Sequence, residues 1–272
     1  MTDKAIIRRG FLDLPAGQVH YRSAVADPRL PCLFILHQSP LSSRSYVRLL
    51  PLLAGTVRAF ALDMPGYGAS DAPHEEEWAI EAYAGFLFAV ADKLGASRFH
   101  LFGRATGALV AASAARTRPE RFLSLTLHGL PLYTAEEGRS LLAGYAPPYR
   151  LDEGGSHLAW IWDRIKHEYP WMDAAMATRM VEDYLAAGPD FAASYRAMWR
   201  YDVRKLHGGW TVPTLLIHGG RDRIAEMRPR AQALLPDAQE VFFDQATNFI
   251  AEQEPERFAA CLLPFLEAHA PS

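Results

Sequence analysis

The chain has 272 residues, of which 50% are hydrophobic and 22% are charged, and its formal net charge is −3. This composition is typical of a soluble globular protein that can bury a substantial core. The lack of a basic excess argues against nucleic acid as a partner, and the lack of long apolar or basic amphipathic runs argues against a membrane.

Cysteine usage and the first residues of the chain bear on the cellular setting. Cys32 and Cys261 make neither a disulfide framework nor a metal-binding spacing, and the opening MTDKAIIRRG lacks the apolar stretch of a signal peptide. We therefore expect a cytoplasmic protein with no metal and no other cofactor. Its expected partner is a small-molecule substrate or ligand, and it is expected to be a monomer or a homodimer.

Short runs rich in β-branched and aromatic residues alternate with helical patterns, which predicts a mostly parallel sheet with helices on both faces. The first two strands are expected to form an antiparallel hairpin around Ala16 and Gly17. The continuous apolar run over 31–38 is typical of a central strand that is covered on both sides. Helices are expected over 43–54, over 78–94, from Thr106 and over 255–268, and further strands over 57–65, 98–103, 122–129, 212–220 and 239–245.

The segment 132–210 interrupts this alternation. It holds most of the tryptophans and tyrosines, and its pattern is helical without obvious strands. Because it lies between two predicted strands, we expect a helical cap over 132–210, inserted into a core made of 1–131 and 211–272. Aromatic residues such as Trp160 and Trp162 could line an apolar pocket under this cap, or they could simply hold the cap on the sheet.

Five short motifs accompany the predicted elements in a recognisable order. HQSP at 37–40 and DMPGYGASD at 63–71 follow strands, and GRATG at 103–107 links a strand to a helix; GGRD at 219–222 and NFIAEQEPERF at 248–258 come later. In this order the motifs resemble those of α/β-hydrolase-fold proteins, in which GRATG would stand at the G-x-S-x-G nucleophile elbow. The resemblance runs nearly end to end. It implies an α/β-hydrolase fold: a mostly parallel eight-stranded sheet, helices on both faces and an inserted helical cap.

The resemblance also implies where the catalytic triad of nucleophile, acid and histidine would stand, namely at Ala105, Asp222 and Asn248. Only the acid is retained. Alanine cannot attack a carbonyl carbon, and an asparagine amide is no base near neutral pH. Since removal of the serine or the histidine from a serine protease costs about 10⁶-fold in rate, we expect no serine-triad hydrolysis. An engineered serine-to-alanine change would account for Ala105 but would leave Asn248 unexplained.

Other features of the resemblance remain intact. They imply an oxyanion hole made by the backbone N–H of Thr106, at a helix N-terminus, and by one from the turn of Gln38 and Ser39. Gln38 replaces the usual glycine of the family and could bring a side-chain amide to the pocket. Arg104 could place a cation at the pocket, or it could pack against a neighbouring acid.

The roles of Asp222 and His128 stay open at this point. If Asp222 is buried beside Asn248 without an imidazole partner, its pKa would rise and suit it to general acid–base work. Otherwise it is a structural acid that bonds to loop amides or pairs with Arg221 or Arg223. His128 follows a strand at the sheet end where open α/β sheets bind ligands, so it is either the best remaining imidazole for the pocket or a structural histidine.

Three functions are compatible with these residues. The first is non-covalent catalysis by the oxyanion hole and Asp222 on a small, partly apolar carbonyl or carboxylate compound, as in a lyase, decarboxylase, isomerase or cofactor-free oxygenase. The second is an atypical hydrolase in which Asp222, alone or with His128, activates water. The third is a catalytically inactive binding or scaffold protein. We rank the first ahead because the turn glycines, the loop at 37–40 and Asp222 all remain.

Overall fold

The computed structural model of the protein describes residues 6–73 and 78–271. Within these residues, eight strands form one sheet in the order β1-β2-β4-β3-β5-β6-β7-β8. The strands are β1 (Arg8–Leu14), β2 (Gly17–Ala24), β3 (Cys32–Leu36), β4 (Arg58–Leu62), β5 (Phe99–Arg104), β6 (Phe122–His128), β7 (Thr214–Gly219) and β8 (Gln239–Phe243).

The helices alternate with these strands along the chain. The α-helices are α1 (Leu50–Leu53), α2 (Ile80–Lys93), α3 (Thr106–Thr117), α4 (Ala135–Gly144), α5 (Ser156–Glu168), α6 (Ala174–Ala187), α7 (Ala193–Arg200), α8 (Arg228–Leu234), α9 (Ile250–Gln253) and α10 (Pro255–Ala268). Short 3₁₀ helices are η1 (Ser43–Tyr46), η2 (Pro119–Arg121), η3 (Val203–Leu206) and η4 (Ala225–Met227). None of the helices in the described ranges has the length and apolarity needed to cross a bilayer.

The sheet is antiparallel at one edge and parallel elsewhere. β1 pairs antiparallel with β2, and β2 pairs antiparallel with β4. The other neighbouring pairs run parallel. The predicted N-terminal hairpin and the mostly parallel eight-stranded sheet are therefore confirmed. Parallel strands need crossover connections, which place helices on the faces of the sheet.

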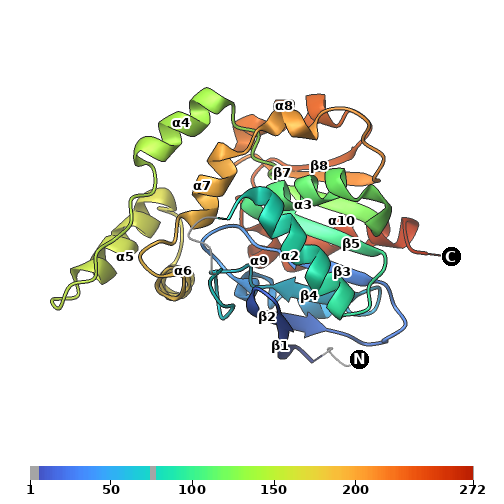
Figure 1. The fold of residues 1–272 in the computed structure, drawn as a ribbon, viewed down its shortest axis with the longest axis horizontal. Helices are drawn as coiled ribbons and strands as arrows, with labels where there is room; N and C mark the ends of the chain where they lie inside the picture. The colour runs from blue at the N-terminus through green and yellow to red at the C-terminus, as the bar shows by residue number, and fades with distance from the viewer. Residues whose placement is uncertain (1–5, 74–77, 272) are drawn as a thin grey trace.

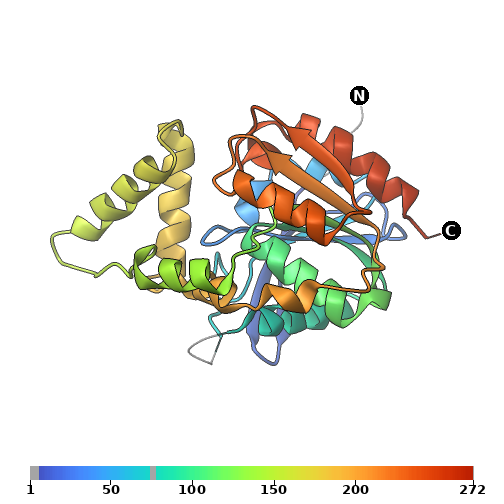
Figure 2. The same cartoon turned by 90° about the horizontal axis from the view of Figure 1, so that it is seen from above.

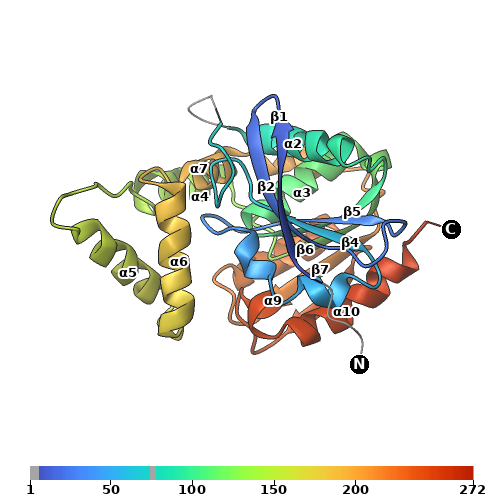
Figure 3. The same ribbon diagram turned by 90° about the horizontal axis from the view of Figure 1, so that it is seen from below.

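The central strand β3 shows why its sequence is apolar without interruption. Its side chains alternate between two buried clusters: Cys32, Phe34 and Leu36 pack with α2 and α3, whereas Leu33 and Ile35 pack with α1 and α10. All five are buried, so neither face of the strand meets water. Figure 3 shows α2 and α3 on one side of the sheet and α9 and α10 on the other, which confirms the prediction of helices on both faces.

Between β6 and β7 the described chain is helical, from α4 through α7 to η3. Figures 1 and 2 show α5 and α6 projecting away from the sheet, while α7 lies nearer to it. This segment has an apolar cluster of its own, in which Ile161 and Ile165 of α5 meet Tyr184 of α6 and Phe191. The role of 132–210 as a cap stays a prediction.

One predicted helix is broken. The stretch 43–54 contains η1 and α1 with a turn over 47–49 between them, instead of one continuous helix. The reason is Pro51, which lies in the first turn of α1. In a longer helix it would stand in the interior, where proline lacks the N–H donor and clashes with the carbonyl four residues earlier. The prediction of a single helix over 43–54 is therefore wrong.

Candidate active site

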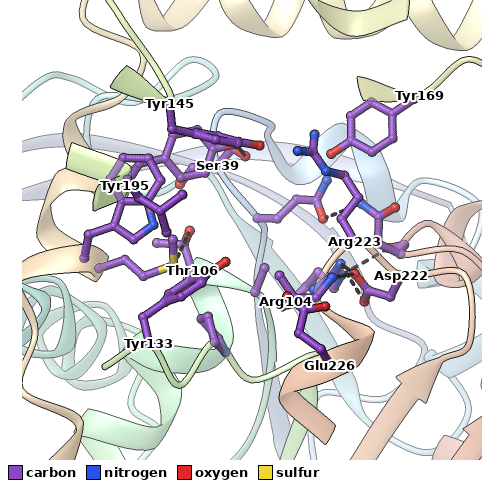
Figure 4. A pocket seen from close by; sticks show the side chains of 18 residues that line it. Ser39, Arg104, Thr106, Tyr133, Tyr145, Tyr169, Tyr195, Asp222, Arg223 and Glu226 are labelled. Atoms are coloured by element: carbon purple, nitrogen blue, oxygen red, sulfur yellow. Dashed lines mark hydrogen bonds and ion pairs between the residues drawn. The ribbon is translucent and has the colours of Figure 1, made fainter. Parts of the chain in front are cut away.

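Loops at the carboxyl edge of the parallel strands enclose a cavity of about 270 Å³, which we call the elbow cavity (Figure 4). Ligands bind at this edge in open α/β sheets. Seven of the candidate site residues from the sequence line the cavity: Gln38, Ser39, Arg104, Ala105, Thr106 at the start of α3, Asp222 and Asn248. Tertiary folding thus brings together positions that lie up to 210 residues apart in the chain.

The turn between β5 and α3 is sharp and strained. Ala105 has φ +47° and ψ −113°, and it is the one non-glycine residue with a positive φ in the described part of the chain. A Cβ on Gly103 would lie 2.2 Å from the carbonyl oxygen of Gly107, and one on Gly107 would lie 2.5 Å from that of Leu36. Both glycines are therefore fixed by close backbone packing. A non-glycine residue in such a conformation costs about 1–3 kcal/mol, which something else in the fold must offset.

This turn directs the start of α3 at the cavity. Thr106 is the first residue of the helix, and N–H groups of a first helical turn have no acceptor within the helix. The loop of Gln38 and Ser39 lines the same cavity. Tyr195 holds this loop by donating its hydroxyl proton to the Ser39 carbonyl oxygen, at 2.6 Å. The residues predicted to form an oxyanion hole therefore lie on one cavity, and their action as an oxyanion hole stays a prediction.

Asp222 is buried in an ion pair with Arg104. The Nη2 atom of Arg104 lies 3.0 Å from Oδ1 and 2.9 Å from Oδ2 of Asp222, and the two side chains are 5% and 2% exposed. Oδ1 also accepts the backbone N–H of Ile224, at 3.1 Å. Of the alternatives left open for Arg104, the structure thus shows the pairing with an acid. Asp222 is paired with an arginine, but with neither Arg221 nor Arg223.

The rest of the Arg104 guanidinium is anchored to backbone. Nε donates to the carbonyl oxygen of Asn248 at 3.1 Å, and Nη1 donates to that of His128 at 3.2 Å. Gly129 leaves room for the ion pair, because a Cβ there would lie 2.6 Å from Nη1 of Arg104 and 2.9 Å from Oδ2 of Asp222. Charge-assisted bonds on three sides hold this guanidinium in one place.

The side chain of Asn248 bonds to a different partner. Its Nδ2 donates to Oε1 of Gln38 at 3.2 Å, and both residues are buried. The amide of Gln38 therefore does reach the cavity wall, but it is bonded to Asn248. Asn248 thus links the other two polar side chains, because Arg104 bonds to its carbonyl oxygen and Gln38 bonds to its side chain.

His128 does not line the elbow cavity. Its ring is buried at 5.7 Å from that of Phe258, and it borders a cavity of only about 20 Å³. Neither ring nitrogen has a hydrogen-bond partner among the described residues. Burial, followed by the positive charge of Arg104, lowers the pKa of His128 well below its ordinary value, so the ring is neutral near pH 7.

Trp160 and Trp162 do not line the elbow cavity either, contrary to the expectation from the sequence. Both pack on the apolar cluster inside the helical segment. The ring of Trp160 lies 6.0 Å from that of Tyr149 and 6.1 Å from that of Phe191. The alternative, that such residues hold the segment on the sheet, does not describe Trp160 either, because its ring contacts are with Tyr149 and Phe191 of the same helical segment.

Other aromatic residues line the cavity, and the sequence did not single them out. They are Tyr133, Tyr145, Tyr169, Tyr195 and Trp199. Figure 4 shows the hydroxyls of Tyr133, Tyr145 and Tyr169 pointing towards the centre of the cavity. Burial raises the pKa of Tyr133 and of Tyr169 to about 12, so these hydroxyls stay protonated and can donate. The only sequence signal for them was the aromatic richness of 132–210.

Two more charged residues line the cavity next to Asp222. Arg223 pairs with Glu168 at 2.6 Å and lies 5.5 Å from the ring centres of Tyr145 and Tyr169. Glu226 makes no hydrogen bond or ion pair with any other described residue. It is therefore the carboxylate that a ligand can reach. Within the described ranges, no group of three His, Cys, Asp or Glu side chains is placed to hold a metal ion.

Comparison with known proteins gives the wider setting. A family model described as alpha/beta hydrolase fold matches residues 31–255. Haloalkane dehalogenase 2 of Mycobacterium tuberculosis (strain ATCC 25618 / H37Rv) is 26% identical over 275 residues, which cover 93% of each protein. The 2-hydroxymuconate semialdehyde hydrolase of Pseudomonas putida is 25% identical over 229 residues, which cover 78% of this chain and 77% of that protein.

Solved structures agree in fold. A hydrolase from Pseudomonas aeruginosa PA01 superposes with a TM-score of 0.78 at 21% identity, covering 95% of this chain and 98% of that one. E-2-(acetamidomethylene)succinate hydrolase superposes with a TM-score of 0.78 at 19% identity, covering 96% of this chain and 100% of that one. At these identities the likeness concerns the fold alone.

Proposed function

The chain belongs to the alpha/beta hydrolase fold family, and we propose that it acts on a small, partly apolar carbonyl or carboxylate compound without any covalent intermediate. The observation that carries this proposal is the strained turn at Ala105. A turn that costs about 1–3 kcal/mol normally serves to present a nucleophile, and alanine presents none. What the turn still provides is Thr106, which lines the elbow cavity as the first residue of α3 and whose N–H has no acceptor within the helix.

The proposed binding mode uses this N–H. A carbonyl or carboxylate oxygen accepts from the amide of Thr106 and from an amide of the Gln38–Ser39 loop, where the helix N-terminus favours negative charge. The ring faces of Tyr195 and Trp199 cover the apolar part of the ligand, and the hydroxyl of Tyr133 can donate to a second oxygen. We further propose that 132–210 acts as the cap that closes this cavity, since seven of the residues that line it belong to this segment: Tyr133, Leu141, Tyr145, Tyr169, Tyr195, Met198 and Trp199.

The ion pair between Arg104 and Asp222 changes the roles foreseen from the sequence. Because Asp222 is committed to Arg104 and to a backbone amide, we propose that it is a positioning residue that fixes Arg104 and the loop of Asn248. The base then has to be Glu226, whose carboxylate is unpaired in the described structure. It would take a proton from the carbon next to the carbonyl, and the electron pair of the broken C–H bond would form an enolate at the oxyanion hole.

A hydrolase in which Asp222 activates water is less well supported. Such a base needs an accessible carboxylate oxygen, alone or with a histidine as relay. The Oδ2 atom of Asp222 accepts no hydrogen bond in the described structure, but it is buried 2.9 Å from Nη2 of Arg104. Among residues 6–73 and 78–271, no histidine hydrogen-bonds to Asp222. The ion pair of Asp222 with Arg104 instead favours a different second candidate. This candidate is a binding protein that keeps the pocket and has no catalytic activity.

One experiment separates these functions. Protein labelled with ¹⁵N is titrated with methyl ketones, carboxylates and aryl acetates while the amide signals of Thr106 and Ser39 are followed by NMR. Intact mass is measured after incubation with the aryl acetates, and deuterium uptake by the ketones is followed in D₂O. We expect shifts of both amides, no mass increase, and deuterium uptake that is lost in Glu226→Gln but kept in the exposed control Glu136→Gln.

Each contrary result has a distinct meaning. An acyl adduct in the mass spectrum would refute the non-covalent proposal. Amide shifts without deuterium uptake would favour the binding protein. Unchanged Thr106 and Ser39 signals with every compound would exclude an oxyanion hole at this turn.

A further inference from the structure

A second cavity adjoins the elbow cavity on the far side of two aromatic residues. Its volume is about 560 Å³, and it lies among α4, α7 and η3. Tyr133 and Trp199 line both cavities. Two consecutive residues of α4 face different cavities: Leu141 lines the elbow cavity, and Leu142 lines the second cavity. The shared residues place the two cavities next to each other, and we call the second one the second lobe.

The boundary between the lobes is rigid. α4 approaches α7 so closely that a Cβ on Gly138 would lie 2.2 Å from the carbonyl oxygen of Trp199. The indole ring of Trp199 is stacked on Tyr195, with ring centres 5.4 Å apart, and meets the edge of Tyr145 at the same separation. The backbone and the ring of Trp199 are therefore both held in place.

Trp199 carries an unused donor at this boundary. The residue is only 6% exposed, and its indole Nε1–H has no hydrogen-bond partner in the described structure. A buried donor without an acceptor costs about 1–3 kcal/mol. An oxygen atom of a ligand that crosses the boundary would remove this cost.

The two lobes differ in charge. In the elbow cavity, Arg104 is neutralised by Asp222 and Arg223 by Glu168. The second lobe is lined by Arg139 and Arg204, and Asp202 is its one carboxylate among the described lining residues. Arg204 pairs with Asp202 at 2.8 Å, whereas Arg139 makes no ion pair with another described residue. Arg139 is thus available to an anion in the second lobe.

We infer that the ligand is elongated and carries an anionic group, a carboxylate or a phosphate, at the end that lies in the second lobe near Arg139. The chain of the ligand passes Tyr133 and Trp199, and an oxygen near the anionic end accepts the Trp199 indole N–H. The inference rests on the proposed function in one respect, namely that the other end occupies the elbow cavity. The elbow cavity alone, about 270 Å³, is smaller than the roughly 300–1,000 Å³ found for small-molecule sites, and the second lobe of about 560 Å³ brings the site well inside that range.

The test uses probes that differ only in length or in charge: acetone, 2-octanone and 7-oxooctanoate. Dissociation constants are measured on the full-length protein by NMR, from the Thr106 amide and from the Trp199 indole N–H signal, which Trp199→Phe identifies. We expect 7-oxooctanoate to bind about fivefold more tightly than 2-octanone, because one exposed ion pair contributes at most about this much to affinity. This advantage should shrink at high salt.

Two variants locate the binding lobe. Arg139→Gln should raise the dissociation constant of 7-oxooctanoate about fivefold and leave that of 2-octanone unchanged. The exposed control Arg150→Gln should change neither dissociation constant. Leu142→Trp fills the second lobe and should weaken both long probes but not acetone. Leu158→Trp on the exposed side of α5 is the matched control for an added indole ring.

The outcomes separate this inference from the proposed function. If acetone shifts Thr106 but 7-oxooctanoate binds no better than 2-octanone, or Leu142→Trp affects acetone and the long probes alike, the second lobe is refuted and the proposed function stands. If 7-oxooctanoate shifts the Trp199 indole signal and depends on Arg139 while Thr106 never shifts, the second lobe is supported and the elbow proposal fails.

Discussion

Building a serine triad at positions 105, 222 and 248 should require the removal of Arg104 as well as the introduction of a serine and a histidine. Ala105→Ser restores a nucleophile and Asn248→His restores an imidazole, but in the double variant Asp222 still has Arg104 at 2.9–3.0 Å. The new histidine would then lack the carboxylate that orients it. The triple variant with Arg104→Met removes the competing cation and leaves a side chain of similar length in its place.

The expected rates follow from what each part contributes in serine proteases. There, loss of the serine or the histidine costs about 2 × 10⁶ in kcat, while loss of the aspartate alone costs about 3 × 10⁴. The double variant should therefore gain at most about two orders of magnitude over the present protein, and the triple variant up to about four more. These are upper limits, because the substrate is not the natural one.

The assay is hydrolysis of p-nitrophenyl acetate, together with labelling of the introduced serine by a fluorophosphonate and detection by intact mass. The control adds Asp222→Asn to the triple variant, and it should remove the rate increase that the triple variant shows over the double variant. If the double variant hydrolyses the ester as fast as the triple variant, Arg104 does not withhold Asp222 and the reasoning is refuted. Circular dichroism of each variant checks that the fold is retained.

Three further predictions concern stability and are measured by urea unfolding. Ala105→Gly should raise the free energy of unfolding by about 1 kcal/mol, because glycine adopts a positive φ freely; a loss of stability would contradict the inferred strain. Asp222→Asn should lower the free energy of unfolding by about 3–5 kcal/mol, because the charge of Arg104 is then buried without an ion-pair partner. A loss below about 1 kcal/mol would mean that water or another group compensates for that charge. Burial raises the pKa of Glu252 from 4.5 to about 7. The carboxyl group of Glu252 therefore binds its proton more tightly in the folded state than in the unfolded chain. Its contribution to stability is present below pH 4.5 and is lost as the pH rises through 7. The free energy of unfolding of Glu252→Gln, relative to that of the wild type, should rise by about 3 kcal/mol between about pH 4.5 and about pH 8. A difference between the two proteins that does not change with pH would refute the raised pKa.

The fold could be predicted because its signals are local. The apolar run of β3 is uninterrupted because both faces of that strand are buried, and the glycines at 103 and 107 stand where backbone packs on backbone. Each of these signals lies within a few residues of the feature that it predicts. The break at Pro51 was also local, and proline chemistry alone would have predicted it.

The partners of the site residues could not be predicted in the same way. Arg104 and Asp222 are 118 residues apart, and Gln38 and Asn248 are 210 apart. Arg221 and Arg223 stand beside Asp222 in sequence and were equally plausible partners. Which arginine reaches the carboxylate depends on where β5 and β7 end relative to one another, and the chain alone does not specify that.

The positions of the aromatic residues of 132–210 could not be predicted either. Trp160 and Trp199 both lie on helices of the segment 132–210, yet Trp160 packs inside the helical segment and Trp199 lines the elbow cavity. Composition predicted that aromatic side chains would matter here. It could not say which ones face the cavity, because a helix that packs on other helices on one side and on a cavity on the other carries apolar residues on both. The sheet and the turn at Ala105 could be predicted from local patterns of residues, whereas the packing of α7 on α2, α3 and α4 decides which aromatic side chains line the elbow cavity.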